Sequence, residues 1–304
     1  MKKSLFITGL SGFVGQHIQS RLQGEDASWE LLPAASPYDL TNPDSLIDLW
    51  PQLPDAVIHL AGQTFVPEAF RDPARTFDIN LLGTLNLLQA LKARGFKGTF
   101  LYVSSGDVYG QVEEPALPIT EQQPPCPRNP YAVSKLSAEF LSLQWGLSEG
   151  WPVLVARPFN HIGTGQKESF VIASAARQIN RIKQGLQAPR LEVGDIDVTR
   201  DFLDVGDVVS AYFALLEKGT PGQVYNICSG HEQSIRSLIE QMGDLAQVKL
   251  QLVQDPARMR RADQRRVCGS HQRLARTTGW TPQITTQQSL RAILSDWEKR
   301  VQQE

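Results

Sequence analysis

Three glycines, each three residues after the last, lie between an apolar run and an amphipathic segment near the start of the chain. Residues 5–8 predict a buried strand, and residues 13–22 have apolar side chains at helical spacing. Gly9 can form the tight turn, Gly12 lets a phosphate approach the backbone, and Gly15 lets helix and strand pack closely. The amides at the helix start favour an anion. This order predicts a dinucleotide site, and an ordinary glycine-rich turn is the alternative.

Short apolar runs and longer amphipathic segments alternate through the first half of the chain. This alternation indicates a parallel sheet with helices on both faces. We predict an α/β fold, with a doubly wound Rossmann domain over 1–158 and a smaller mixed α/β substrate domain over most of 159–304. Strands near 201–226 are expected to return to the first domain. Further strands are expected at 31–35, 56–60, 99–104 and 153–157, and further helices at 73–94, 131–148, 170–184, 207–216, 235–243 and 286–300.

The composition is that of an ordinary globular protein. A net charge of −2 over 304 residues gives no electrostatic reason to bind nucleic acid or a membrane surface. Apolar runs stay well short of the roughly 20 residues that cross a bilayer. Cys126, Cys228 and Cys268 lie far apart, match no metal-ligand spacing and suit a reducing compartment. We expect a cytoplasmic protein with no metal and no nucleic-acid or membrane partner.

The residues after the second expected strand leave the choice between NADH and NADPH open. An acidic residue at this place would bind the ribose hydroxyls of NAD. Residues 35–37 are Ala-Ser-Pro, which include neither an acid nor an arginine. Asp39 and Leu40 follow and can line an adenine pocket, although Asp39 can equally be a turn residue.

A tyrosine and a lysine four residues apart are the main catalytic candidates. On a helix, Tyr131 and Lys135 share one face, and Asn129-Pro130 before them is typical of a helix start. A free tyrosine has a pKa near 10, and a neighbouring cation is expected to lower it. Ser105 ends a predicted strand at the sheet edge where ligands of doubly wound sheets bind, and its hydroxyl can hold a reacting oxygen. The pattern favours carbonyl/alcohol chemistry.

Taken together, these motifs resemble the extended short-chain dehydrogenase/reductases that act on nucleotide sugars. The resemblance covers nearly the whole chain. It rests on the glycine turn, Ser105, the Tyr–Lys pair and five further stretches: His-Leu-Ala-Gly at 59–62, Asn-Leu-Leu-Gly-Thr at 80–84, Arg-Pro-Phe-Asn at 157–160, Arg-Asp-Phe-Leu-Asp-Val at 200–205 and Gly-Trp-Thr-Pro at 279–282. Each motif alone is weak, but their common order is specific.

The resemblance implies roles for individual residues. Those expected to contact the cofactor are Gly9, Gly12, Phe13, Val14, Gly15, Asp39, Leu40, Ala61, Gly62, Gln63, Asn80, Tyr131 and Lys135. Those expected to contact the substrate are Ser105, Gly106, Asp107, Tyr131, Asn160, Arg200, Arg260, Arg261 and Asp263. Guanidinium groups suit a diphosphate because their fork matches its oxygens. For the arginines of 258–261, a solvated basic loop is the alternative.

Members of this family carry out three reactions: 4-epimerisation, 4,6-dehydration and reduction of a 4-keto group. Residues 106–107 bear on the choice between dehydration and reduction. Dehydratases use a carboxylate, usually Glu, two places after the Ser/Thr, and some add an Asp before it. Here these places hold Asp107 and Gly106, which argues against dehydration and leaves reduction of a keto group by NADPH or NADH. Residues 157–166 and 193–195 resemble enzymes of GDP-linked 6-deoxyhexoses, so a GDP-linked 4-keto-6-deoxyhexose is the implied substrate.

Three alternatives remain: a GDP-sugar dehydratase, a UDP-sugar epimerase and an NAD(P)-binding sensor without turnover. The complete Ser–Tyr–Lys set disfavours the sensor, because a sensor needs no activated phenol. Relatives also imply a homodimer formed through the helices at 73–94 and 131–148. Packing within one chain explains the apolar faces of those helices equally well.

Overall fold

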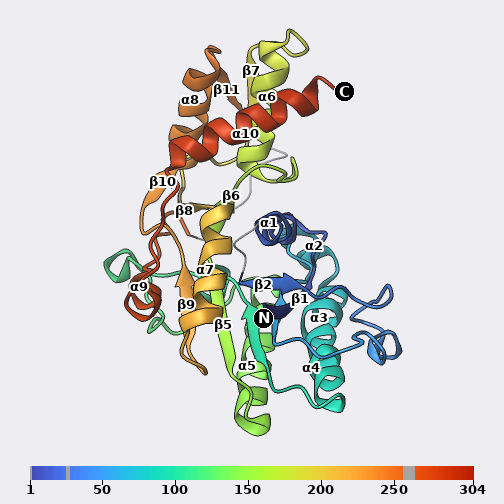
Figure 1. Cartoon of the computed structure of the whole chain (residues 1–304). Helices are drawn as coiled ribbons and strands as arrows, with labels where there is room; N and C mark the ends of the chain where they lie inside the picture. The colour runs from blue at the N-terminus through green and yellow to red at the C-terminus, as the bar shows by residue number, and fades with distance from the viewer. Residues whose placement is uncertain (1, 25–27, 256–263) are drawn as a thin grey trace.

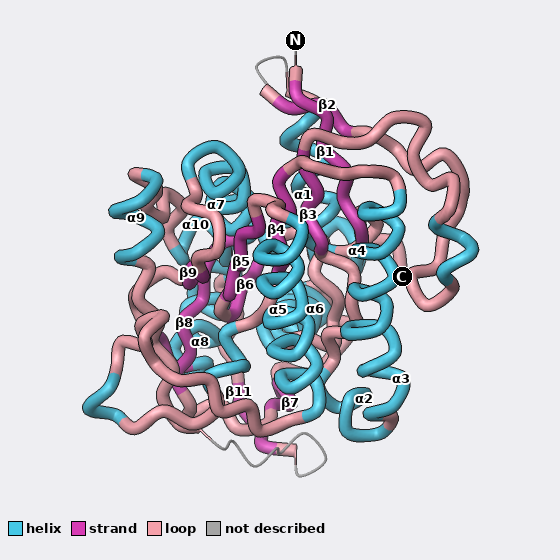
Figure 2. Tube along the Cα trace, turned by 90° about the horizontal axis from the view of Figure 1, so that it is seen from below, coloured by secondary structure: helices cyan, strands magenta, loops and turns pink. Residues whose placement is uncertain are grey.

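A six-stranded parallel sheet forms the centre of the larger part of the molecule. The computed structural model describes residues 2–24, 28–255 and 264–304. The strand order is β2-β1-β3-β4-β5-β9, and the strands lie side by side in Figure 2. Their bounds are β1 Lys3–Thr8, β2 Trp29–Leu31, β3 Ala56–His59, β4 Thr99–Val103, β5 Val153–Pro158 and β9 Val224–Ile227.

Helices cover both faces of this sheet. Apolar side chains of α1 (Phe13–Leu22), α7 (Val205–Lys218) and α9 (Gln272–Thr278) share one core cluster with the sheet. A second cluster joins the opposite face to α4 (Gly83–Ala93) and α5 (Pro130–Glu149). The predicted doubly wound α/β fold is therefore confirmed. The remaining helical segments here are α2 Val66–Arg71, α3 Pro73–Phe77, the π-helical η2 Asp78–Leu82, and the 3-10 turns η1 Pro43–Leu46, η3 Gly106–Tyr109 and η4 Glu114–Ala116.

The smaller part lies at one end of the molecule, at the top of Figure 1. It has a three-stranded sheet of order β10-β8-β6 and a two-stranded sheet of β11 and β7. Three helices enclose a core cluster of their own with these strands. The bounds are β6 Asn160–Ile162, β7 Arg190–Val193, β8 Thr199–Asp204, β10 Glu232–Ser234, β11 Gln251–Gln254, α6 Val171–Lys183, α8 Ile235–Ala246 and α10 Thr286–Val301. Among the described residues, we find no helix whose length and apolar character would let it cross a membrane.

Two expectations about the strands need correction. The strand expected at 31–35 ends at Leu31, because Pro33 has no N–H to donate to a neighbouring strand. Of the chain near 201–226, only β9 joins the central sheet. β8 instead pairs with β6 and β10, where Arg200 and Asn160 lie in adjacent strands. The domain division at residue 158 stays a prediction.

Candidate active site

The glycine turn leads from β1 into the start of α1. Gly9 has φ +74°, and a Cβ there would lie 2.9 Å from the backbone nitrogen of Ala61. A Cβ on Gly15 would lie 2.4 Å from the carbonyl oxygen of Leu10. Gly12 is the N-cap of α1 and brings no side chain over the amides of the first turn. The turn thus exposes helix-start amides, as a pyrophosphate requires.

A buried histidine links this turn to the loop after β3. His59 contacts the hydroxyls of Thr8 (Nδ1 to Oγ1, 2.6 Å) and Thr84 (Nε2 to Oγ1, 2.9 Å). The Thr84 hydroxyl donates its hydrogen to the carbonyl of Asn80, so His59 must donate through Nε2 and accept from Thr8 through Nδ1. The Thr8 hydroxyl in turn accepts from the amide of Ala61. Burial lowers the pKa of His59 to about 3, so the ring is neutral.

Asn80 links the loop after β3 to α5, the helix that carries Tyr131 and Lys135. Its Oδ1 accepts from the amide of Gln63 at 2.7 Å, and its Nδ2 donates to the Gln63 carbonyl and to the hydroxyl of Ser134 on α5. A Cβ on Gly62 would lie 2.9 Å from Asn80 Oδ1 and 3.9 Å from the ammonium of Lys135. Asn80 therefore sets the distance between the loop at 61–63 and Lys135.

Tyr131, Lys135 and Ser105 converge at the carboxyl end of the sheet. Asn129 caps α5 by accepting from the amide of Ala132 (2.7 Å), which places Tyr131 and Lys135 in the first two turns. Ser105 follows β4 and caps η3 by accepting from the amide of Asp107. Tyr131 is hydrogen-bonded to Ser105 and is 9% exposed, and Lys135 is 4% exposed.

The pKa values in this group correct one expectation. Burial lowers the pKa of Lys135 to about 7, and the carboxylate of Glu139 opposes that shift. The pKa of Tyr131 is raised, mainly by burial and further by Asp107, while the hydrogen bond with Ser105 lowers it. The expected lowering of the Tyr131 pKa is not found, because burial of the phenol and the nearby Asp107 raise this pKa more than Ser105 lowers it. Tyr131 is a firmly protonated phenol.

Asp107 and Arg200 face each other beside the phenol. The Asp107 side chain is partly open to solvent, the protein packed around it raises the pKa of its carboxyl, and Arg200 on β8 opposes that shift. The preceding residue, Gly106, lies against the ring of Phe159, and a Cβ added to Gly106 would lie 3.1 Å from that ring. A side chain at position 106, such as the acid of some dehydratases, would crowd Phe159.

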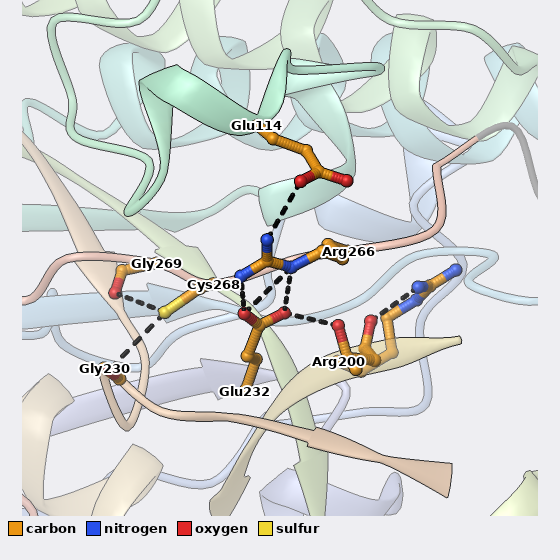
Figure 3. A network of polar contacts seen from close by, with 8 residues as sticks. Glu114, Arg200, Gly230, Glu232, Arg266, Cys268 and Gly269 are labelled. Atoms are coloured by element: carbon orange, nitrogen blue, oxygen red, sulfur yellow. Dashed lines mark hydrogen bonds and ion pairs between the residues drawn. The ribbon is translucent and has the colours of Figure 1, made fainter. Parts of the chain in front are cut away.

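A polar network extends from Arg200 to the loops around it (Figure 3). Arg200 donates to the carbonyl of Thr199 at 2.7 Å, and the Thr199 hydroxyl donates to Glu232 on β10. Arg266 pairs with Glu232 and, through Nη1 at 3.0 Å, with Glu114 of η4. Arg266 therefore joins the smaller sheet to the loop that follows the Ser105 turn.

The other predicted residues do not belong to the group around Tyr131 and Lys135. The ring of Phe13 stacks on the ring of His161 with their centroids 6.0 Å apart, which connects α1 to β6. Val14 packs against the core cluster. Asp39 accepts from the amide and hydroxyl of Thr41, as a turn residue does, and Leu40 is buried in the core. Their contacts with adenine stay predictions. Arg260, Arg261 and Asp263 lie outside the described residues.

Three side chains near the site were not among the predicted residues: Glu139, Arg157 and Arg266. Glu139 and Arg157 are a buried ion pair beside Lys135. A signal for Glu139 existed, since it follows Lys135 by one helical turn. Arg266 could not be found, because its partners Glu114 and Glu232 are distant in sequence.

Comparison with known proteins agrees with this geometry. A sequence model described as GDP-mannose 4,6 dehydratase matches residues 34–293. Over all 304 residues the chain is 74% identical to a GDP-6-deoxy-D-mannose reductase from Pseudomonas aeruginosa, and the alignment covers 100% of both chains. A solved structure of RMD from the same organism, complexed with NADPH, superposes with a TM-score of 0.96 at 73% identity, covering 98% of this chain and 100% of that one.

More distant relatives share the architecture. A UDP-glucose 4-epimerase from Thermotoga maritima, solved with UDP-glucose, has a TM-score of 0.86 at 25% identity and covers 99% of this chain and 100% of its own. A GDP-mannose 4,6-dehydratase from Vibrio cholerae is 29% identical, with 86% of this chain and 78% of the relative covered. The chain therefore belongs to the GDP-mannose 4,6-dehydratase family of nucleotide-sugar short-chain dehydrogenase/reductases.

Proposed function

We propose that this protein reduces the 4-keto group of GDP-4-dehydro-6-deoxy-D-mannose with NADPH or NADH, which gives GDP-6-deoxy-D-mannose (GDP-D-rhamnose). The observation that carries the proposal is a protonated Tyr131 hydrogen-bonded to Ser105 and one helical turn from Lys135. Such a phenol is a proton donor, which is what the reduction of a ketone requires. The identity of the relative that is 74% identical over the full chain supports this substrate.

The residues present fit a nicotinamide dinucleotide. The bare N-terminus of α1 suits its pyrophosphate, and the loop at 61–63 lies between that turn and Lys135. Lys135 would bind the ribose beside the nicotinamide. When bound, the reduced cofactor supplies the hydride. The NADPH in the structure of RMD supports the phosphorylated form, and residues 35–37 carry no acid that would repel a 2′-phosphate.

In the proposed reaction each side chain has one task. Tyr131 donates its phenolic proton to the C4 oxygen as negative charge develops there. Ser105 hydrogen-bonds that oxygen and holds it beside the phenol. Lys135 stabilises the phenolate that forms, so its charge is needed when the proton leaves. Arg200 and Asn160, on adjacent strands β8 and β6, would hold the sugar diphosphate.

Dehydration is the second candidate, since the family includes dehydratases. It would need a base to take a proton from C5. Asp107 is one methylene shorter than the usual glutamate, and the ring of Phe159 leaves little room for an acid at position 106. Both features favour reduction.

A stoichiometric assay tests the proposal. With GDP-4-dehydro-6-deoxy-D-mannose and NADPH, we expect one equivalent of NADPH consumed per sugar and GDP-D-rhamnose as product, whereas a dehydratase or an epimerase returns its cofactor unchanged. Tyr131→Phe should lose most turnover and still bind NADPH. Tyr225→Phe, which removes a hydroxyl on β9 that accepts from the amide of Thr220, is the matched control. Near-full activity of Tyr131→Phe would refute the assignment.

We also propose that the enzyme is a cytoplasmic homodimer. Large apolar side chains are exposed on neighbouring helical segments: Phe70 on α2 (62% exposed), Leu82 on η2 (49%), and Phe140 (56%) and Leu147 (89%) on α5. Since α5 packs against α2 and η2, these side chains border one helical face that a second copy can cover. Phe140→Lys should give a monomer in sedimentation at micromolar concentration, and a wild-type monomer would refute the proposal.

A further inference from the structure

We propose that Arg157 and Glu139 form a buried brace that positions both catalytic elements, the Ser105 turn and the helix bearing Tyr131 and Lys135, and that balances the charge around Lys135. The two residues act through the groups they contact, Tyr109 and Lys135, and are therefore positioning residues.

The ion pair has two parallel hydrogen bonds. Arg157 Nε donates to Glu139 Oε2 at 3.0 Å, and Arg157 Nη2 donates to Oε1 at 2.5 Å. Arg157 is 4% exposed and Glu139 is fully buried. Taking two charges out of water costs several kcal/mol per ion, and a pair replaced by apolar residues is often no less stable. Stability alone is therefore a weak reason for charges at these positions.

The brace contacts both catalytic elements at once. Glu139 lies on α5 four residues after Lys135, on the same helical face. The guanidinium of Arg157, on β5, lies 4.8 Å from the ring centroid of Tyr109. Tyr109 ends η3, the turn that Ser105 caps, and its hydroxyl donates to Asn226 Oδ1 on β9 at 2.6 Å. Arg157 thus fixes the position of the serine turn relative to α5.

The brace also controls the charge near Lys135. The groups that act on its ammonium are Glu139 on α5, the ring of Tyr102 on β4, whose centroid lies 4.7 Å away, and the neutral His59 on β3. Glu139 is the anion among them, and it raises the pKa of Lys135 against the effect of burial. Arg157 partly neutralises Glu139.

Opposite substitutions should therefore have opposite effects on Lys135. Glu139→Gln leaves the guanidinium of Arg157 unopposed and should lower the pKa of Lys135. Arg157→Met leaves the carboxylate of Glu139 unopposed and should raise the pKa of Lys135. Each shift in the Lys135 pKa should be on the order of 1 unit, as expected when a nearby charge is removed. The double variant removes both charges and should return close to wild type.

The test is a lysine Cε NMR titration of the cofactor-free protein, with the Lys135 signal assigned by its loss in Lys135→Met. This readout does not need turnover. The pH dependence of kcat/KM should shift in the same directions. Glu149→Gln is the matched control, because Glu149 lies on the same helix and pairs with Lys92 at 2.7 Å on the surface. It should leave the Lys135 midpoint unchanged.

Shifts of opposite sign in the two single variants support the brace. Unchanged midpoints, or shifts in one direction, overturn it. If Arg157→Met does not fold, Glu139→Gln and Arg157→Lys provide the test. Arg157→Lys keeps the positive charge at position 157, so the titration midpoint of Lys135 should not change. Its ammonium cannot hold Glu139 and Tyr109 together, so kcat should fall at least tenfold. The kinetic arm rests on the proposed reductase activity. An inactive wild type would refute that function, whereas unshifted NMR midpoints in an active enzyme would refute only the brace.

Discussion

Replacing His59 by phenylalanine should destabilise the protein by an amount that depends on pH. Phenylalanine has nearly the same shape and removes both ring nitrogens. The hydroxyl of Thr8 then loses the acceptor for its hydrogen, and Thr84 loses the donor to its oxygen. One orphaned buried donor and one lost hydrogen bond together cost about 2–4 kcal/mol. We expect this loss in the free energy of unfolding at pH 7.5.

The loss should be smaller at acidic pH. Burial lowers the pKa of His59 from 6.5 to about 3, so between these values the unfolded chain binds a proton at this residue and the folded chain does not. The wild type is thereby destabilised as the pH falls below about 6.5. At pH 5 the effect is about 2 kcal/mol, at about 1.4 kcal/mol per pKa unit. His59→Phe has no such proton, so its deficit relative to wild type should shrink by that amount.

Urea unfolding followed by tryptophan fluorescence at pH 7.5 and pH 5 measures the difference. His231→Phe, at an exposed imidazole, controls for the loss of a histidine in general. In the wild type, ¹⁵N NMR should show His59 protonated at Nε2 alone and unchanged from pH 5 to pH 8. A deficit that is the same at both pH values would refute the lowered pKa of His59, and a proton on Nδ1 would refute the assignment of the hydrogen bonds.

Three further predictions concern the cofactor and substrate regions. Gly15→Ala puts a methyl within 2.5 Å of two backbone carbonyls and should weaken NADPH binding at least tenfold by calorimetry; unchanged affinity would contradict close helix–strand packing. If the charge of Lys135 is required, kcat/KM for NADPH should fall as the pH rises through about 7; a flat profile from pH 6 to 8 would exclude this. Arg266→Gln breaks exposed ion pairs worth about 0–1 kcal/mol each, so the thermal midpoint should change by only a few degrees in differential scanning calorimetry; a much larger loss would show that joining β10 to the loop after the Ser105 turn stabilises the fold.

Local chemistry made much of this protein predictable from its sequence. The positive φ of Gly9 favours glycine and the close backbone contacts at Gly9 and Gly15 leave no room for a Cβ, so a turn of this kind is visible in the glycine spacing. The Asn129 cap and the four-residue interval between Tyr131 and Lys135 predict the helix that carries them. Both depend on neighbours in the chain. The strand expected at 31–35 ends at Leu31 for an equally local reason, since Pro33 has no N–H to donate to a neighbouring strand.

What only the tertiary structure decided depends on groups far apart in the chain. The pKa of Tyr131 was expected to fall because of Lys135, but it rises, since burial depends on the whole fold around the phenol. The tautomer of His59 follows from hydroxyls 51 residues before and 25 residues after it. The brace unites β5 with α5 and η3. Sequence spacing indicates which groups share a helix or a turn, but solvent exclusion and charge pairing arise where distant segments meet, and they set the protonation states on which the proposed chemistry depends.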